Sequence, residues 1–153
     1  MSDRKISKIT SLQKVDVRRI YCLRKTILRP SESQLSWCKY VGDFDTHSFH
    51  LRALSNCGSA VGIGSFINET KKINQSIYHY RLRGIGVLTE YRKQGIGGAI
   101  LSELIRLKPE QDRKIWLSGR THHEKWYSRF GFSKVGPIYD VPGTGPHSLF
   151  IEI

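Results

Sequence analysis

The part of the sequence with the clearest chemical potential is a basic loop with three glycines, Arg92-Lys93-Gln94-Gly95-Ile96-Gly97-Gly98. An apolar strand pattern over residues 77–88 precedes the loop, and apolar residues with helical spacing follow it from Ala99. Glycine lets the backbone come close to a ligand, and the start of a helix offers unpaired N–H groups and the positive end of its dipole. The loop is therefore predicted to bind an anionic ligand such as a phosphate.

Two common nucleotide motifs do not fit this loop. A P-loop needs Gly-x-x-x-x-Gly-Lys-Ser/Thr, and the sequence contains no such string. A dinucleotide fingerprint needs a third glycine or alanine, but the nearest string, at residues 84–89, has Thr89 there and lies inside the predicted strand. Both nucleotide readings are excluded.

The loop matches the pattern Arg/Gln-x-x-Gly-x-Gly/Ala over residues 92–97, and here the chain resembles the GNAT superfamily of N-acetyltransferases. About thirty residues later, the string WYSRFGF at residues 126–132 is similar to the family's Phe-Tyr-x-x-x-Gly-Phe signature. The resemblance covers most of the chain. It implies one N-acetyltransferase domain over residues 1–153, of α/β (α+β) class, with a single mixed, mostly antiparallel sheet flanked by helices.

The resemblance implies acetyl-CoA as cosubstrate and no metal. Backbone N–H groups of the loop would cradle the pyrophosphate, while Arg92 and Lys93 add positive charge at the rim. The preceding strand would pair with the pantetheine arm, and its glycines are typical of a bulge or a close backbone approach. The implied cofactor-binding residues are Ile85, Gly86, Val87, Arg92, Lys93, Gln94, Gly95, Ile96, Gly97 and Gly98.

Acetyl transfer to an amine needs a neutral amine, a polarised carbonyl and a proton for the departing thiolate. By resemblance, Tyr127 is the catalytic acid, and the acetyl group passes directly to a primary amine in a ternary complex. Backbone N–H groups freed at a strand irregularity near Val87 would stabilise the oxyanion. The base and the acceptor contacts stay open. The candidates are His79 on the predicted strand, Glu90 beside the loop, His122 and His123 at the start of the short helix, and His147, which follows a proline as in small bacterial relatives. Ser118 departs from the family, which often has Asn there.

Positive charge is the other strong signal. Lys and Arg number 25 against 13 Asp and Glu, and residues 1–30 carry +7 of the formal +12. Such a field attracts polyanions. Two alternatives to the enzyme therefore stay open, a nucleic-acid-binding protein and a non-catalytic CoA-binding module. No basic–aromatic interleaving accompanies the basic residues of the N-terminal helix, so only weak, non-specific nucleic-acid binding is expected. These residues are Arg18, Arg19, Arg24 and Lys25.

Turn residues and apolar periodicity predict the elements that position these groups. Helices are expected at residues 16–28, from 99 to a stop at Pro109, and at 121–130. Strands are expected at residues 48–54, 60–67, 77–88, 114–117, 132–135 and 147–153, with a turn-rich segment over residues 136–146. This order predicts a single mixed sheet covered by helices.

Three cysteines without metal-ligand spacing, together with a polar N-terminus, predict a cytoplasmic protein with reduced thiols. No uncharged stretch is long and apolar enough to cross a bilayer, so no membrane partner is expected. A covalent acetyl-cysteine route through Cys38 is disfavoured because nothing in the sequence fixes a histidine beside it. The acceptor is expected to be an amine on a small molecule, peptide or protein, and a homodimer stays open.

Overall fold

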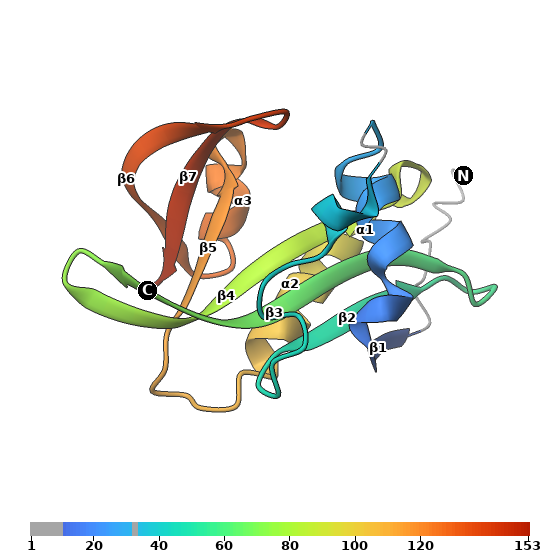
Figure 1. Cartoon of the computed structure of the whole chain (residues 1–153), viewed down its shortest axis with the longest axis horizontal. Helices are drawn as coiled ribbons and strands as arrows, with labels where there is room; N and C mark the ends of the chain where they lie inside the picture. The colour runs from blue at the N-terminus through green and yellow to red at the C-terminus, as the bar shows by residue number, and fades with distance from the viewer. Residues whose placement is uncertain (1–10, 32–33) are drawn as a thin grey trace, which may run out of the picture.

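The computed structural model describes residues 11–31 and 34–153 and places seven strands in one sheet (Figure 1). Across the sheet the order is β1-β2-β3-β4-β5-β7-β6. The strands are β1 (Ser11–Val15), β2 (Phe49–Leu54), β3 (Ala60–Ile73), β4 (Ser76–Val87), β5 (Ile115–Arg120), β6 (Phe132–Val141) and β7 (Gly145–Glu152). The helices of the described residues are α1 (Tyr21–Leu28), α2 (Ile96–Arg106) and α3 (Glu124–Ser128).

All neighbouring strands are antiparallel except β4 and β5, which are parallel. A parallel pair needs a crossover connection, and α2 provides it. The sheet is thus mixed, mostly antiparallel and flanked by helices, which confirms the predicted fold class.

The parallel pairing of β4 with β5 is short, so the two strands separate beyond it. β4 and β5 are in register only from Tyr80 opposite Ile115 to Leu82 opposite Leu117. Beyond these residues β5 continues along β7, and β4 continues along β3. Figure 1 shows the β5–β7 part of the sheet diverging from β1–β4. A wedge therefore lies between the second halves of β4 and β5.

Helices cover both faces of the sheet beside this wedge. On one face, α2 packs so close to β3 that a Cβ on Gly64 would lie 2.6 Å from the side chain of Ile100. On the other face, a Cβ on Gly86 of β4 would lie 2.5 Å from Ile27 of α1. The glycines in these strands thus allow close approach of the helices, which anchors the walls of the wedge.

The N-terminal half departs from the sequence prediction in two ways. The helix expected at residues 16–28 is a 3₁₀ turn (Val17–Arg19) followed by α1, because the Asp16 side chain accepts the Arg18 N–H at 2.9 Å and caps a separate turn. β1 was not predicted. It is an edge strand paired only with β2, so its polar composition gave a weak strand signal.

The C-terminal half also differs from the prediction. The segment over residues 136–146 is mostly strand, because a register shift between Val135 and Tyr139 accommodates Gly136 and a proline at the sheet edge. The helix expected at residues 121–130 is a 3₁₀ turn (Thr121–His123) followed by α3. α2 ends at Arg106, before the predicted stop at Pro109, and β3 continues beyond residue 67 in a two-stranded ribbon with β4.

Candidate active site

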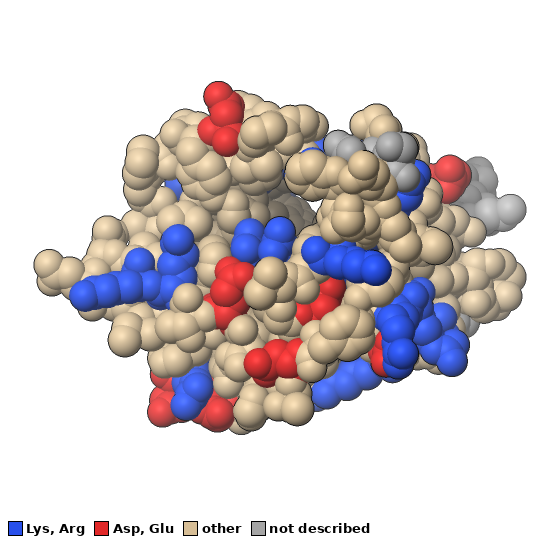
Figure 2. Space-filling model, viewed as in Figure 1, with Lys and Arg blue, Asp and Glu red and all other residues tan. Residues whose placement is uncertain are grey.

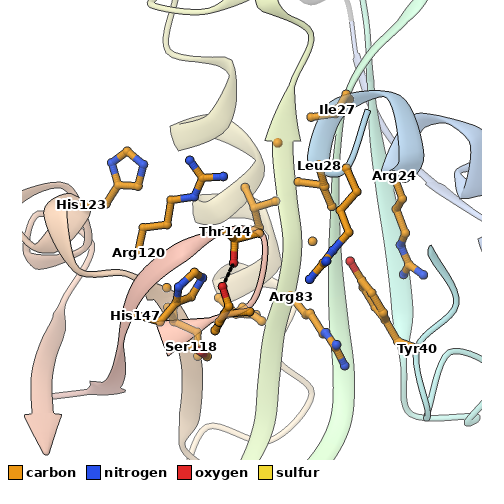
Figure 3. A pocket seen from close by; sticks show the side chains of 18 of the residues that line it. Arg24, Ile27, Leu28, Tyr40, Arg83, Ser118, Arg120, His123, Thr144 and His147 are labelled. Carbon is orange, nitrogen blue, oxygen red and sulfur yellow. Dashed lines mark hydrogen bonds between the residues drawn. The ribbon is translucent and has the colours of Figure 1, made fainter. Parts of the chain in front are cut away.

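The wedge between β4 and β5 holds a cleft of about 540 Å³. Its lining includes residues 81–87 of β4, residues 117–120 of β5, parts of α1 and the β6–β7 turn. Figure 3 shows Arg83 and Tyr40 on one side of the cleft and His147 and Arg120 on the other. Of the residues predicted from the sequence, the cleft lining includes Ile85, Gly86, Val87, Arg92, Tyr127 and His147.

The glycine loop leads directly into α2. Gly95 adopts a left-handed conformation with φ +80° and forms the N-cap. The Ala99 N–H binds the Gly95 carbonyl at 3.0 Å, so the N–H groups of residues 95–98 precede the first helical hydrogen bond. A Cβ on Gly95 would meet no atom within 4 Å, so open space lies over the loop. Open space above free helix amides fits a diphosphate.

The basic side chains of the loop differ in their contacts. The Arg92 side chain donates from Nε to the Val87 carbonyl oxygen at 3.2 Å, which ties the loop to the end of β4. Lys93 has a φ of +62°, which is unusual for a residue with a side chain and sharpens the turn. Arg92, Lys93 and Gln94 are all exposed. The positive charges of Arg92 and Lys93 thus lie at the surface, close in sequence to the amides.

The two sequence signatures, thirty residues apart, meet in space. A Cβ on Gly97 would lie 3.7 Å from the Trp126 ring, and a Cβ on Gly98 would lie 3.0 Å from the Phe130 ring. α3 therefore packs against the first turn of α2. This contact brings the loop glycines and the aromatic signature into one packed unit.

Tyr127 forms part of the cleft wall. Its ring lies 4.6 Å from that of Phe150 and 5.1 Å from that of Trp126. Gly119 of β5 makes room for the phenol, since a Cβ there would lie 2.7 Å from the hydroxyl oxygen. Burial raises the pKa of Tyr127 to about 12, although Arg120 opposes the shift. The hydroxyl is therefore fully protonated at neutral pH and can donate a proton or a hydrogen bond.

Two histidines line the cleft. His147 Nδ1 lies 2.8 Å from the Gly145 carbonyl oxygen, which can only accept, so Nδ1 donates this hydrogen bond and Nε2 is left for other partners. His123, one of the candidate bases that the sequence left open, is the second. Desolvation, His122 and Arg120 lower its pKa. His79 is not part of the lining, and its Nδ1 is buried without a hydrogen-bond partner in the described residues.

The predicted strand irregularity is a bulge in β4. Ile63 pairs with Gly86 and Ser65 pairs with Arg83, so two residues of β4, Gly84 and Ile85, lie opposite one residue of β3. Gly84 has a φ of +65°, and a Cβ there would lie 2.9 Å from the Tyr40 hydroxyl. The bulge lies two to three residues before the position expected near Val87.

Several cleft residues carried no recognisable sequence signal. Tyr40 and Trp37 come from the segment after α1, and Arg29, Arg83 and Arg120 come from three different elements. Ser118, where the family often has Asn, lines the cleft and hydrogen-bonds the Tyr139 hydroxyl. Cys38 also lines the cleft, but burial raises the pKa of its thiol, which disfavours a thiolate nucleophile.

The basic N-terminal region is less available than the sequence suggested. Arg24 is 1% exposed and pairs with Asp43 at 2.8 Å, and the exposed Arg18 pairs with Asp16. Figure 2 shows Lys and Arg side chains interspersed with Asp and Glu on the face viewed. The prediction for residues 1–10 lies outside the described residues. In the part of the chain that the structure describes, no helix is long and apolar enough to cross a membrane.

Comparison with known proteins gives the class and the family of this protein. The family model for the acetyltransferase (GNAT) domain matches residues 47–134. The chain belongs to the GNAT family of acetyltransferases. It is 31% identical over 139 residues to the Bacillus subtilis protein described as "Uncharacterized N-acetyltransferase YitI", covering 90% of this chain and 92% of the relative.

Solved structures share the fold at lower identity. Escherichia coli ElaA superposes with a TM-score of 0.69 at 17% identity, covering 94% of this chain and 99% of that one. Arabidopsis thaliana Naa50, in complex with the bisubstrate analogue CoA-Ac-MVNAL, superposes with a TM-score of 0.68 at 21% identity, covering 94% and 97%. These likenesses extend over nearly the whole chain.

Proposed function

We propose that this protein transfers the acetyl group of acetyl-CoA directly to a primary amine within a ternary complex. The observation that supports this most strongly is the continuity of the site. The cleft along the open half of β4 reaches from Arg92, beside the amides of α2, to Tyr127 in the far wall. A diphosphate on these amides and a thioester beside Tyr127 would occupy one continuous channel.

The cofactor-binding residues act mainly through their backbone. Residues 85–87 of β4 face a gap in the sheet, so their peptide groups can bind the amides of a pantetheine arm. Acetyl-CoA, when bound, supplies an activated acyl thioester. The bulge at Gly84 and Ile85 removes peptide groups from the regular ladder, and such N–H groups can stabilise negative charge on the acyl oxygen.

Proton transfer falls to groups on the opposite wall. The amine nitrogen attacks the acyl carbon, the C–S bond breaks, and Tyr127 donates its hydroxyl proton to the departing thiolate. His147, whose Nδ1 is held by the Gly145 carbonyl, accepts at Nε2 the proton that the amine loses. The arginines of the wall help earlier, because nearby positive charge lowers the pKa of a bound ammonium group and favours the neutral amine.

A panel of primary amines, assayed by release of the CoA thiol, tests this function. Transfer predicts thiol release that depends on the amine and yields one acetylated amine for each thiol. Thermal unfolding with acetyl-CoA supplies the second measurement. Stabilisation by acetyl-CoA without thiol release over the whole panel would instead support a non-catalytic CoA-binding module. Thiol release at equal rate without amine would indicate hydrolysis and contradict the proposal.

A further inference from the structure

The charged side chains that line the cleft are all positive. Six arginines and no Asp or Glu are found among the described residues that line it. Three of the arginines are engaged: Arg24 pairs with Asp43, Arg81 pairs with Glu69, and Arg92 donates to the Val87 carbonyl. The other three are Arg29, Arg83 and Arg120, whose side chains form no hydrogen bond or ion pair with any described residue.

Arg83 is the most costly of these to leave without a counter-ion. It is half-buried on the open half of β4, and its guanidinium lies 3.9 Å from the centre of the Tyr40 ring. Desolvation and the neighbouring Arg81 lower the pKa of Arg83. Stacking on an aromatic ring orients a guanidinium but does not neutralise it. The five N–H groups of Arg83 therefore remain available to an anion in the cleft.

Arg29 reaches the same cleft from the end of α1. Its guanidinium lies 5.0 Å from the Trp37 ring, and a Cβ on Gly143 would lie 3.8 Å from its Nη1 atom. Gly143 belongs to the β6–β7 turn, next to Thr144 of the cleft lining. Arg29 thus spans the cleft from α1 to the turn, and its charge is aimed across the opening.

The phosphates of CoA do not account for this pair. The cradle for them is the N-terminus of α2, whose helix packs on the face of the sheet marked by Gly64. Arg83 instead stacks on Tyr40, beside Gly84, and Arg29 follows α1, which covers Gly86 on the other face. The two arginines therefore lie on the α1 side of β4, away from the cradle. In the space-filling view, basic side chains border the hollow between the two parts of the molecule (Figure 2).

We propose that Arg83, assisted by Arg29, binds an acidic oxyanion carried by the acceptor itself. The acceptor is then a small amine that also bears a carboxylate or a phosphate group. This inference rests on the proposed acetyl transfer and assigns its substrate class. Guanidinium groups bind both kinds of oxyanion through paired N–H donors, so carboxylate and phosphate share one chemistry here. Anchoring the acid at Arg83 leaves the amine free to reach the bulge of β4.

Matched pairs of acceptors test the proposal. The carboxylate arm compares each common L-amino acid with its carboxamide, and the phosphate arm compares phosphoethanolamine with ethanolamine. For at least one pair, kcat/KM for the acidic member is expected to exceed that of the neutral one by about 10- to 100-fold, the range for hydrogen bonds to charged groups. The arm in which the preference appears identifies the source of the oxyanion.

Variants then locate the preference. Arg83→Met keeps the aliphatic stem and should remove most of the preference through the KM of the acceptor, while the KM of acetyl-CoA is unchanged. Arg29→Met should reduce the preference less. Arg106→Met is the matched control, because Arg106 is an exposed residue of α2 paired with Glu103 and its loss changes the net charge equally. Thermal unfolding with acetyl-CoA checks that each variant is folded.

Calorimetric titration of the same pairs into CoA-saturated protein separates this inference from the transfer reaction. Acidic members that bind more tightly, in a manner lost in Arg83→Met, support the oxyanion site even if no amine is acetylated. That result would support the oxyanion site and contradict the proposed acetyl transfer. Equal behaviour of both members of every pair, in binding and in turnover, would overturn the oxyanion site. A rise in the KM of acetyl-CoA in Arg83→Met would also overturn it and assign Arg83 to the cofactor.

Discussion

Two parts of β4 differ in strand pairing and burial. Residues 80–82 pair with β3 on one edge and with β5 on the other, and Tyr80 and Leu82 are buried in the main core. Residues 83–87 pair with β3 alone and line the cleft with their other edge. β4 thus changes at Arg83 from a stretch that is paired on both edges, here called the paired half, to a stretch that is paired on one edge, the open half.

The two parts of β4 also differ in how their arginines are paired. Arg81, at the end of the paired half, binds Glu69 at 3.1 Å and stacks on Trp116 at 4.8 Å. Arg83 stacks on Tyr40 and has no acidic partner among the described residues. In the paired half a carboxylate of the protein neutralises the charge, whereas in the open half no described carboxylate pairs with it. The contrast separates side chains that stabilise the fold from those that serve the site.

The largest expected effect tests the paired half. Leu82→Ala removes a side chain that is 2% exposed and should lower the free energy of unfolding by about 2–5 kcal/mol. Ile85→Ala, in the half-buried open half, is the matched deletion and should lower it less. Urea unfolding of both variants measures the difference. Equal losses would mean that the open half contributes as much to stability as the paired half.

The next effect tests the cradle that borders the open half. Acetyl-CoA at 100 times its dissociation constant should stabilise the protein by about 2.7 kcal/mol. Gly97→Glu should abolish this shift, because it fills the cradle and places a like charge beside the diphosphate. Ser102→Glu, an exposed position further along α2, adds the same charge and should keep the shift. A folded Gly97→Glu variant with the full thermal shift would exclude the loop from the site.

A third effect concerns the far wall. Tyr127→Phe keeps the ring against Phe150 but loses the hydroxyl, so acetyl-CoA binding should persist while kcat falls by about 10²-fold. Because the pKa of Tyr127 is raised to about 12, the wild-type rate should show no loss of this acid below pH 9. Single-turnover kinetics measure the chemical step. An unchanged rate would assign Tyr127 to packing alone.

The smallest effect again falls on the paired part of the sheet. His50 of β2 is buried, with Nε2 2.9 Å from the Asp43 carbonyl and Nδ1 2.8 Å from the Ser65 hydroxyl. Desolvation and nearby Arg24 lower its pKa below the usual 6.5, despite the contact with Asp43. The unfolded state then binds more protons, so stability should fall as pH drops below about 6.5, by at most about 1.4 kcal/mol per pH unit.

Unfolding at pH 7.5, 6.5 and 5.5 measures this slope, and His50→Gln should flatten it. His123→Asn is the control in the open region, because its pKa is lowered too but its side chain is exposed. A slope that survives in His50→Gln and vanishes in His123→Asn would place the titrating group in the cleft.

Local patterns predicted most of this architecture. The glycine loop, the helix after it and the aromatic signature are short-range features, and each occupies the expected element. Two edge strands were not predicted in full. β1 was missed because its sequence is polar, and the outer part of β6 was missed because this strand contains Gly136 and a proline, which an edge strand tolerates. The predicted N-terminal helix is divided into the 3₁₀ turn Val17–Arg19 and α1. This division depends on the cap at Asp16 rather than on apolar spacing.

The site was predictable only where it is local. The loop and Tyr127 belong to recognisable strings, but Arg29, Tyr40 and Arg83 come from separate segments joined by the fold. Nothing in the sequence indicates which arginines find a carboxylate, since Arg24 meets Asp43 across 19 positions. His79 illustrates the reverse error, because a titratable residue on the right strand lies beyond the cleft. Pairing of charges is a tertiary property.

The ring of Tyr40 has a consequence for how this protein can diversify. It lies 3.9 Å from two guanidinium groups, that of Arg24, which belongs to the buried network with Asp43, and that of Arg83. A substitution at Tyr40 would therefore act at once on the buried Arg24 network and on the proposed oxyanion site at Arg83. Substitutions that change the acceptor are therefore expected to be tolerated less at Tyr40 than at Arg83. Laboratory evolution for a different amine should accumulate changes at Arg83 and Arg29 while Tyr40 persists.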